Sequence, residues 1–232
     1  MLARWTGIAL VVAAIHLIGA SHSTAGVMVS GDAALLAAAP PSVFADSLES
    51  NDVAWVFAER KNFLLLSDLD VNVLSPGRIF GNALESVFNL SSQRVNSFFV
   101  SFDPVGRPGG LDPFWTANGA LRFETPILGI ITADRQLYDS ENLGLRSTTT
   151  IYPIEGVSTG ARGMDATDLS FDFVEISADR LTVSFGMAAR FPSDQFRVIT
   201  AAPVPEPAGS VIFGLGALCI AGIRTRRRVN AL

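Results

Sequence analysis

The residues that could carry acid–base, nucleophilic or metal chemistry are unevenly distributed along these 232 residues. Both histidines, His16 and His22, lie among the first 25 residues, and the single cysteine, Cys219, lies in an apolar run near the other end. Residues 26–202 therefore contain neither His nor Cys. This composition excludes from that segment a Ser-His-Asp triad, a Cys-His dyad, a zinc site with His or Cys ligands, and a disulfide.

Carboxylates are the main remaining candidates for chemistry in residues 26–202. This segment holds 21 of the 22 acidic residues but only 12 of the 17 basic ones, so its net charge is −9. Such a surface repels phosphate backbones, and we expect no nucleic-acid partner. Lys61 is the only lysine and gives Schiff-base chemistry a single candidate. No pair of acids stands out by its spacing for glycoside hydrolysis, so we expect no enzyme and no cofactor.

Two small groups of polar residues have a composition suited to Ca²⁺, which binds oxygen ligands. Asp68, Asp70 and Asn72 alternate with apolar residues, so they would project together from one face of a strand. Asp165 and Asp168 form the second group. Neither group has the Asp-x-Asp-x-Asp-Gly spacing of a calcium loop. We therefore interpret them as a solvated strand face and a turn, and expect no metal.

One aromatic pair could contact sugars. Phe114 and Trp115 end a Gly- and Pro-rich loop over residues 102–115, and exposed aromatic rings can stack on sugar rings. The simpler interpretation is that both rings cap the hydrophobic core.

Short strands must position these side chains. Alternating or continuous apolar stretches predict strands at 68–74, 95–102, 121–124, 127–132 and 195–200. Residues 31–50 are rich in Ala and Pro, and we expect an irregular lead-in over 26–50, with a helical turn over 33–38.

The clearest predicted hairpin joins 169–173 to 181–185 through residues 177–179. Its expected core face consists of Leu169, Phe171, Phe173, Leu181, Val183 and Phe185. Many short strands separated by Gly, Pro and Asp, with little helical periodicity, predict an all-β domain over 51–202. We expect an antiparallel β-sandwich or a jelly-roll-like domain.

The N-terminal residues 1–25 have the three parts of a secretory signal peptide. Arg4 supplies the positive charge, residues 7–19 form an apolar run, and Ser23 and Ala25 are small residues at the two positions that a signal peptidase inspects. We therefore expect an N-terminal signal helix and cleavage after Ala25. The alternative is an uncleaved anchor helix, for which the apolar run is short.

The C-terminal residues also form three parts. A Pro-rich stalk at 203–207 contains Pro205, Glu206 and Pro207, and residues 208–223 form an uncharged apolar run that could cross a bilayer. The tail at 224–232 begins with the basic cluster Arg224, Arg226, Arg227 and Arg228. Because basic flanks stay in the cytoplasm, we expect the stalk to face outward, on the same side as the mature N-terminus.

This tail resembles the PEP-CTERM sorting signal of exported bacterial proteins, on the Pro-Glu-Pro motif, the apolar segment and the arginine cluster over residues 204–228. The resemblance implies removal of the tail at or near the motif by exosortase, a membrane-embedded enzyme that resembles cysteine proteases and transpeptidases. The alternative is an ordinary single-pass anchor with a proline-rich stalk.

Several short sequence segments over about residues 49–200, among them 102–106 and 126–131, also resemble a recurring type of PEP-CTERM ectodomain without an assigned activity. The expected protein is therefore exported, passes transiently through the inner membrane, and ends at the cell surface or outside the cell. Signal peptidase and exosortase are its expected processing enzymes. We expect a structural or adhesive role in the envelope or exopolysaccharide matrix. The alternatives are a carbohydrate- or calcium-binding module and a carboxylate-dependent enzyme acting on polysaccharide.

Overall fold

The computed structural model describes residues 26–80, 86–105, 114–153, 163–164, 172–189 and 193–203. Within these ranges the chain consists mainly of strands, with one short helix, which confirms the all-β fold class. No helix in this part of the chain is long and apolar enough to cross a membrane.

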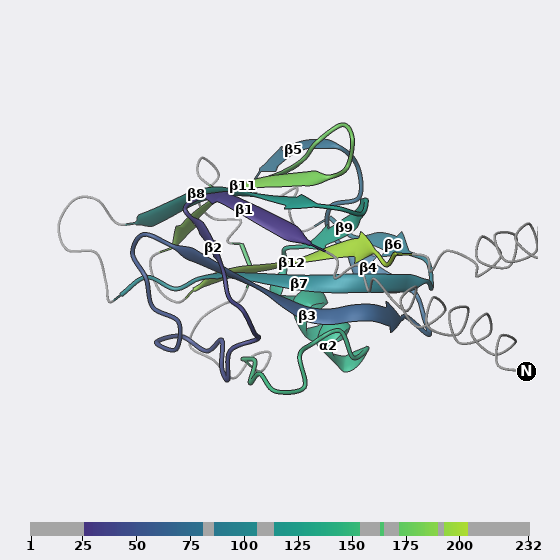
Figure 1. The fold of residues 1–232 in the computed structure, drawn as a ribbon, viewed down its shortest axis with the longest axis horizontal. Helices are drawn as coiled ribbons and strands as arrows, with labels where there is room; N and C mark the ends of the chain where they lie inside the picture. Colours follow the sequence, from purple (N-terminus) through teal and green to yellow (C-terminus); the bar gives the residue numbers. More distant parts are fainter. Residues whose placement is uncertain are drawn as a thin grey trace, which may run out of the picture. The chain divides into compact units, whose positions relative to one another are not determined.

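Ten of the strands form two five-stranded sheets (Figure 1). The first sheet consists, from edge to edge, of β1 (Val27–Gly31), β8 (Trp115–Phe123), β11 (Thr182–Ala189), β10 (Phe173–Ile176) and β5 (Gly77–Phe80). The second consists of β2 (Ala33–Leu35), β3 (Ala54–Leu64), β7 (Arg94–Phe102), β12 (Asp194–Ala201) and β9 (Ile127–Ile131). A separate antiparallel pair is formed by β4 (Leu69–Val71) and β6 (Phe88–Leu90). Neighbouring strands within the two sheets are antiparallel except β2 and β3.

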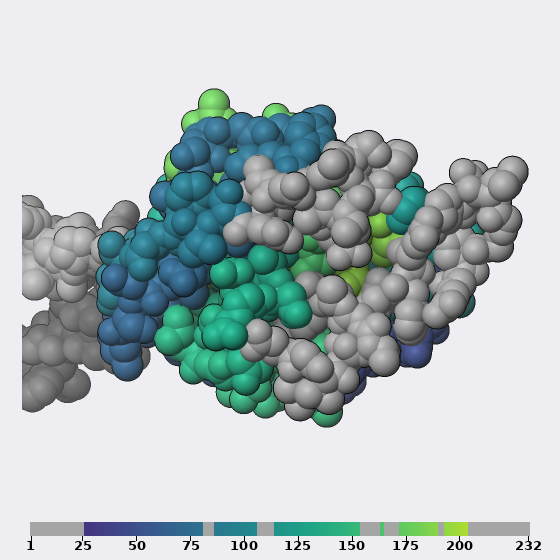
Figure 2. Space-filling model, turned by 180° about the vertical axis from the view of Figure 1, so that it is seen from behind, coloured from purple at the N-terminus to yellow at the C-terminus, as the bar shows by residue number. Residues whose placement is uncertain are grey.

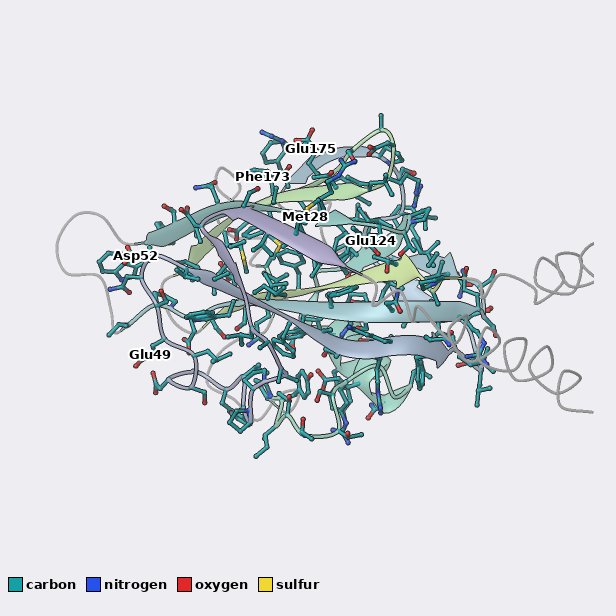
Figure 3. The ribbon with its side chains drawn as sticks, viewed as in Figure 1. Met28, Glu49, Asp52, Glu124, Phe173 and Glu175 are labelled. Carbon is teal, nitrogen blue, oxygen red and sulfur yellow. The ribbon has the colours of Figure 1, made fainter. Side chains whose placement is uncertain are left out.

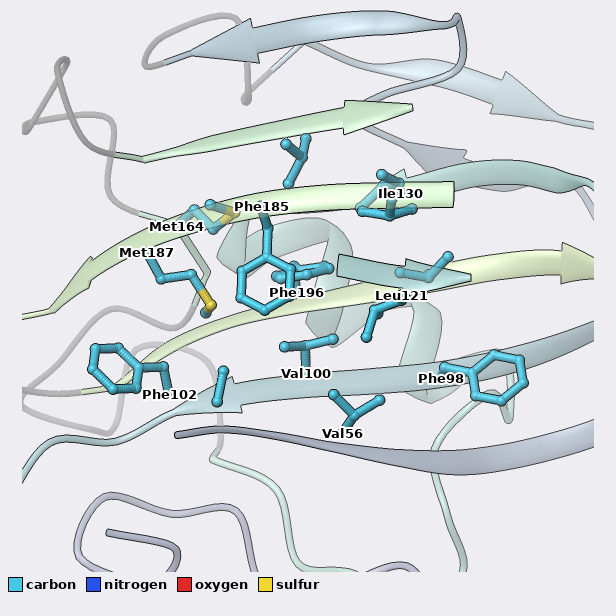
Figure 4. Close-up of a cluster of buried hydrophobic side chains, with 14 of the residues drawn as sticks. Val56, Phe98, Val100, Phe102, Leu121, Ile130, Met164, Phe185, Met187 and Phe196 are labelled. Carbon is cyan, nitrogen blue, oxygen red and sulfur yellow. The ribbon is translucent and has the colours of Figure 1, made fainter. Parts of the chain in front are cut away.

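The main hydrophobic core contains side chains from both sheets (Figure 4). Alternate residues of a strand point to opposite faces, so β11, for example, contributes Val183, Phe185, Met187 and Ala189 to this core. Phe185 of the first sheet and Phe196 of the second illustrate the contact, with ring centroids 5.4 Å apart. Burying an aromatic or aliphatic side chain of this size contributes about 1.5–3 kcal/mol. The two sheets are therefore held together by this shared apolar layer.

The second sheet is buried on its other face as well. Phe57, Phe99 and Ile199 each follow a residue of the main core and belong to a second hydrophobic cluster. That cluster also contains Leu137 of the helix α2 (Asp134–Asn142) and Tyr152 from the segment that follows it. Because both faces are covered, β7 and β12 are buried along nearly their whole length. This explains why their sequences read as mostly apolar runs with little alternation.

Several predicted strands are confirmed. The segments 95–102, 127–132 and 195–200 correspond to β7, β9 and β12. The predicted 121–124 is the end of the longer β8, and the predicted 68–74 contains the short β4.

The expectation for residues 26–50 is wrong in part. This segment contains β1 and β2, which join the first and the second sheet, so it is not simply an irregular lead-in. Residues 33–35, predicted to begin a helical turn over 33–38, form the strand β2 instead. The N–H of Ala54 donates to the carbonyl of Asp32, and the N–H of Leu36 donates to that of Val56, so pairing with β3 overrides the helix propensity of the alanines.

The predicted hairpin is correct in its pairing and wrong in part of its core face. β10 pairs with β11, and Val183 and Phe185 are buried as predicted. Phe173, however, faces away from the main core, where its ring lies 5.8 Å from that of Phe80 and the Arg78 guanidinium lies 4.2 Å from its centroid. Val174 takes its place in the core, because Val174 and Phe185 are register partners. Leu169 and Phe171 lie outside the described residues, and Leu181 is half-buried.

A fully buried ion pair lies on the second face of the second sheet. The side chains of Arg197, in the middle of β12, and Glu59, in β3, have no exposed surface. The Nε and Nη2 atoms of Arg197 donate to the two carboxylate oxygens of Glu59 at 2.6 and 2.7 Å. Glu59 also accepts hydrogen bonds from the hydroxyls of Ser97 at 2.6 Å and Tyr152 at 2.7 Å. This two-pronged arrangement is the geometry in which an arginine and a carboxylate bind most strongly.

The same guanidinium holds α2 against the sheet. Its Nη1 atom donates to the carbonyl of Leu137 at 3.2 Å and to the hydroxyl of Ser140, and its Nη2 lies 3.7 Å from a carboxylate oxygen of Glu141. Burial alone would lower the pKa of Arg197, but the charge and hydrogen bonds of Glu59 raise it above its ordinary value. Burial and the charge of Glu59 likewise raise the pKa of Tyr152. Arg197 is therefore charged in the folded protein.

Replacing Glu59 by Gln tests this ion pair. The variant leaves the Arg197 charge buried without its main counter-charge, so we expect the free energy of unfolding to fall by about 3–5 kcal/mol. Urea unfolding monitored by circular dichroism measures this change. The matched control is Glu175→Gln, which breaks the 2.7 Å pair with Arg78 at the surface and should cost at most about 1 kcal/mol. Equal small losses in both variants would contradict the importance of the buried pair.

Candidate functional site

The predicted processing and sorting residues lie outside the described part of the chain. They are Ser23, Ala25, Pro205, Glu206, Pro207, Arg224, Arg226, Arg227 and Arg228. Asp165 and Asp168, the second proposed calcium group, also lie outside it. The candidates that the structure does describe are the group at residues 68–72, the aromatic pair at 114–115, and one carboxyl group that the sequence patterns missed.

The predicted polar face of residues 68–72 is only partly formed. Asp70 in β4 and Asp68, directly before this strand, are exposed, and an oxygen of Asp68 accepts the N–H of Ser92 at 3.3 Å. Asn72 is completely buried: its Oδ1 accepts the N–H of Thr132 at 2.8 Å, and its Nδ2 donates to the carbonyl of Ser86 at 3.0 Å. The prediction that Asn72 projects beside the two aspartates is therefore wrong.

A local bulge is the physical reason for this difference. The N–H groups of Asn72 and Val73 both donate to the carbonyl of Ile130, at 2.8 and 3.0 Å. Two residues thus oppose one, which interrupts the alternation of side chains along the strand. Asn72 turns inward and connects β4 to the end of β9, while Asp70 stays at the surface.

Asp68 and Asp70 line an open pocket of about 290 Å³ beside α2. The helix contributes the polar side chains of Gln136, Asp139 and Asn142. Figure 2 shows this side of the molecule, where the green-teal residues around α2 lie next to the blue residues from about 60 to 80. The lining offers carboxylate and amide groups suited to hydroxyl or cationic ligands. Among the described residues, however, no group of three or more His, Cys, Asp or Glu could hold a metal ion.

The helix wall of this pocket depends on the buried ion pair. Ser140 lines the pocket and also accepts a hydrogen bond from Arg197. Asp139, also in α2, accepts a hydrogen bond from the Nε of Arg135 at 2.8 Å. It could approach Asp68 or Asp70 only by losing that contact. One wall of the pocket is thus the short helix α2, whose position is set by its hydrogen bonds with the buried Arg197.

The aromatic pair behaves in part as a core cap. Trp115 is the first residue of β8, is half-buried, and packs against the main core, which confirms the simpler interpretation for this ring. Its indole N–H is buried and has no hydrogen-bond partner among the described residues. Phe114 is half-buried next to it. Neither ring is presented as a fully exposed platform for sugar.

Asp103 is a buried carboxyl group that sequence patterns did not single out. It follows the end of β7, only 2% of it is exposed, and its Oδ2 atom has no hydrogen-bond partner among the described residues. Burial is the largest of the causes that raise its pKa from 3.8 to about 6, and the charges of Asp46 and Glu49 add to the rise. Backbone N–H groups of Asp46 and Leu48 bind it and act in the opposite direction.

This carboxyl group ties a loop to the second sheet. Besides the contacts to its side chain, the carbonyl of Asp103 accepts the N–H of Ser50 at 2.7 Å. The group is not among the residues that line the pocket beside α2. Its hydrogen bonds and raised pKa make it a pH-sensitive structural contact.

Asp103→Asn tests the effect of this group on stability. Because its pKa in the folded state lies above 3.8, the stability conferred by its proton is lost as the pH rises through about 6. The variant keeps a carbonyl for the backbone N–H groups and removes the charge. We expect its unfolding free energy, relative to wild type, to increase between about pH 4 and pH 7. Urea unfolding over this range measures it, with Asp52→Asn as the exposed control; a difference independent of pH would contradict the assignment.

Calcium provides the test of the pocket. We expect neither added Ca²⁺ nor EGTA to change the melting temperature, because Asn72 is withdrawn from the group and Asp68 and Asp70 alone are too few ligands. Differential scanning calorimetry of wild type and of a double variant, Asp68→Asn with Asp70→Asn, checks this. A calcium-dependent shift that disappears in the double variant would contradict the expectation for the pocket. A shift that persists would point to Asp165 and Asp168.

Comparison with known proteins leaves the site to be judged on its geometry. No family model matches the chain, and no curated protein or solved structure does so either. The resemblance of residues 204–228 to a sorting signal therefore rests on the motif in the sequence.

Proposed function

We propose that the chain is an exported protein that is sorted to the cell surface or extracellular matrix through a PEP-CTERM signal. The observation that carries this proposal is the succession of Pro205-Glu206-Pro207, the apolar run 208–223 and the arginine cluster at 224–228. In this account signal peptidase removes residues 1–25, the membrane holds the tail, and exosortase cuts at or near the motif.

The three parts of the tail have different physical roles in this proposal. The apolar run partitions into the bilayer, and the arginines keep their end in the cytoplasm. Pro205-Glu206-Pro207 has no such role in transfer between water and lipid. A carboxylate between two prolines is a stiff, extended epitope at the membrane surface, which suits recognition by an enzyme.

For the ectodomain we propose a structural or adhesive role, carried by an antiparallel sandwich or jelly-roll-like domain between a signal helix and a transmembrane sorting helix. Two five-stranded sheets with a shared core support the sandwich arrangement. Residues 26–202 also lack the His and Cys that many catalytic and zinc sites use. A stable, acidic scaffold with net charge −9 fits a role outside the cell.

Binding of carbohydrate is the second candidate function, and one observation favours it. The open pocket beside α2 presents the carboxylates of Asp68 and Asp70 with the amides of Gln136 and Asn142, which can accept and donate hydrogen bonds to sugar hydroxyls. A glycan array with the mature protein tests this candidate, with Asp70→Ala as the matched pocket variant. Binding that Asp70→Ala abolishes would favour it over a purely structural role. A polysaccharide-acting enzyme is the third alternative. A carboxyl group with a raised pKa could serve as its general acid, but Asp103, which has such a pKa, does not line this pocket.

Replacing Glu206 by Ala tests the sorting proposal. The variant should insert normally, because the apolar run and the arginines are unchanged, but processing should stop and the uncut chain should accumulate in the inner membrane. Intact-mass analysis and membrane fractionation measure this outcome.

The control is a chain in which residues 208–223 are replaced by another Leu/Ala segment with the arginines kept. We expect this control to be processed like wild type, because the run acts through its hydrophobicity. An unchanged mature mass and location in Glu206→Ala would overturn the proposal and leave an ordinary anchor.

A further inference from the structure

We infer that the carboxylate of Glu124 binds the new α-ammonium group that signal-peptide cleavage creates at Gly26. This inference rests on the proposed export and on cleavage after Ala25. The backbone nitrogen of Gly26 lies 3.1 Å from Oε2 of Glu124. The atom that the sequence assigns as the mature N-terminus is therefore the atom that this carboxylate contacts.

The sheet register brings the two residues together. β1 is an edge strand of the first sheet, and its first residue, Val27, is the register partner of Phe123 at the end of β8. Gly26 and Glu124 come directly before and directly after this pair, so they face each other just beyond the ladder. Figure 3 shows Glu124 and Met28 near β1.

The residue type at position 26 allows the close contact. A Cβ atom on Gly26 would lie 2.7 Å from Oε1 of Glu124 and 3.1 Å from its carboxyl carbon. The carboxylate thus occupies the space that a side chain at this position would take. A glycine at the first mature position leaves that space open for Glu124.

Cleavage changes the chemistry of this contact. Water adds to the carbonyl of Ala25, the C–N bond to Gly26 breaks, and the products are a carboxylate on Ala25 and an amine that takes up a proton on Gly26. One peptide N–H donor becomes an ammonium group with three donors and a positive charge. Before cleavage only the acceptor, the carboxylate of Glu124, carries a charge; after cleavage the donor is charged as well, so the hydrogen bond becomes an ion pair. It holds Gly26, the residue directly before the edge strand β1, which has a neighbour on one side only.

The other charged groups described at this end of the sheet are already engaged. Arg122 is the register partner of Met28, and its Nη1 lies 3.9 Å from Oδ2 of Asp179. The Nε of Arg180 donates to the carbonyl of Ile127 at 2.8 Å, and its Nη2 donates to that of Leu74 at 2.9 Å. Glu124 is the carboxylate whose Oε2 lies 3.1 Å from the nitrogen of Gly26, in position to bind the new ammonium group.

Competitive acetylation tests the inference on the mature exported protein. Trace acetic anhydride is applied from about pH 6 to pH 10, and mass spectrometry of the N-terminal peptide follows the α-amine, which ordinarily has a pKa of about 7.7–8.0. Lys61 carries the only ε-amine and serves as the internal reference. We expect wild type to begin at Gly26 with the α-amine pKa raised by about half a unit or more, because an opposite charge favours the charged form.

The variants separate the contact from general effects. Glu124→Gln keeps the shape of the side chain and removes its charge, so its α-amine should titrate in the ordinary range and react several-fold faster near pH 7. Asp52→Asn is the matched control, because Asp52 is exposed and lies at the far left of Figure 3, away from Glu124. It should titrate like wild type.

Each remaining result has a defined meaning. A mature chain that begins at Gly26 but titrates identically in wild type and Glu124→Gln would overturn the inference and leave the export proposal standing. An exported chain cut elsewhere would overturn the inference and the cleavage position. A chain that keeps Met1 to Trp5 outside the cytoplasm would overturn signal cleavage itself.

Discussion

The packing of α2 against the second sheet depends on the buried ion pair of Arg197 and Glu59. A guanidinium without any exposed surface must find its hydrogen-bond acceptors inside the protein, since an unpaired buried charge costs several kcal/mol. Glu59 supplies two acceptors from β3, and α2 supplies two more through Leu137 and Ser140. The sheet and the helix are therefore specified together, and neither could be repositioned without removing acceptors from the buried guanidinium.

This constraint connects the interior to the surface where ligands could bind. Because Ser140 contacts Arg197 on one side and lines the open pocket on the other, the wall formed by α2 is fixed by the core. The first sheet is organised differently: its inner face packs in the main core, and its edge strand β1 begins at Val27, directly after Gly26, the residue expected to be the mature N-terminus. The two-sheet domain lies between the two segments on which the proposed processing acts.

The sequence predicted most of the second sheet and little of what covers it. The runs that became β7, β9 and β12 are apolar enough to be recognised without tertiary information. The helix α2 was missed because it has nine residues and Leu137 is its only buried apolar side chain, so it carries no helical periodicity. Asn72 was misplaced because a bulge depends on the pairing partner Ile130 and leaves no local signal. A charged residue inside an apolar run, such as Arg197 in 195–200, was the one signal that could have indicated the buried pair.

Native-state hydrogen exchange of the α2 amides tests the central claim most directly, namely that α2 and the second sheet form one cooperative unit through Arg197. We predict that the slowest amides of α2 open with the same free energy as those of β7 and β12, and that Glu59→Gln lowers both values together. A helix whose amides exchange through a separate, low-energy opening, unaffected by Glu59→Gln, would contradict it.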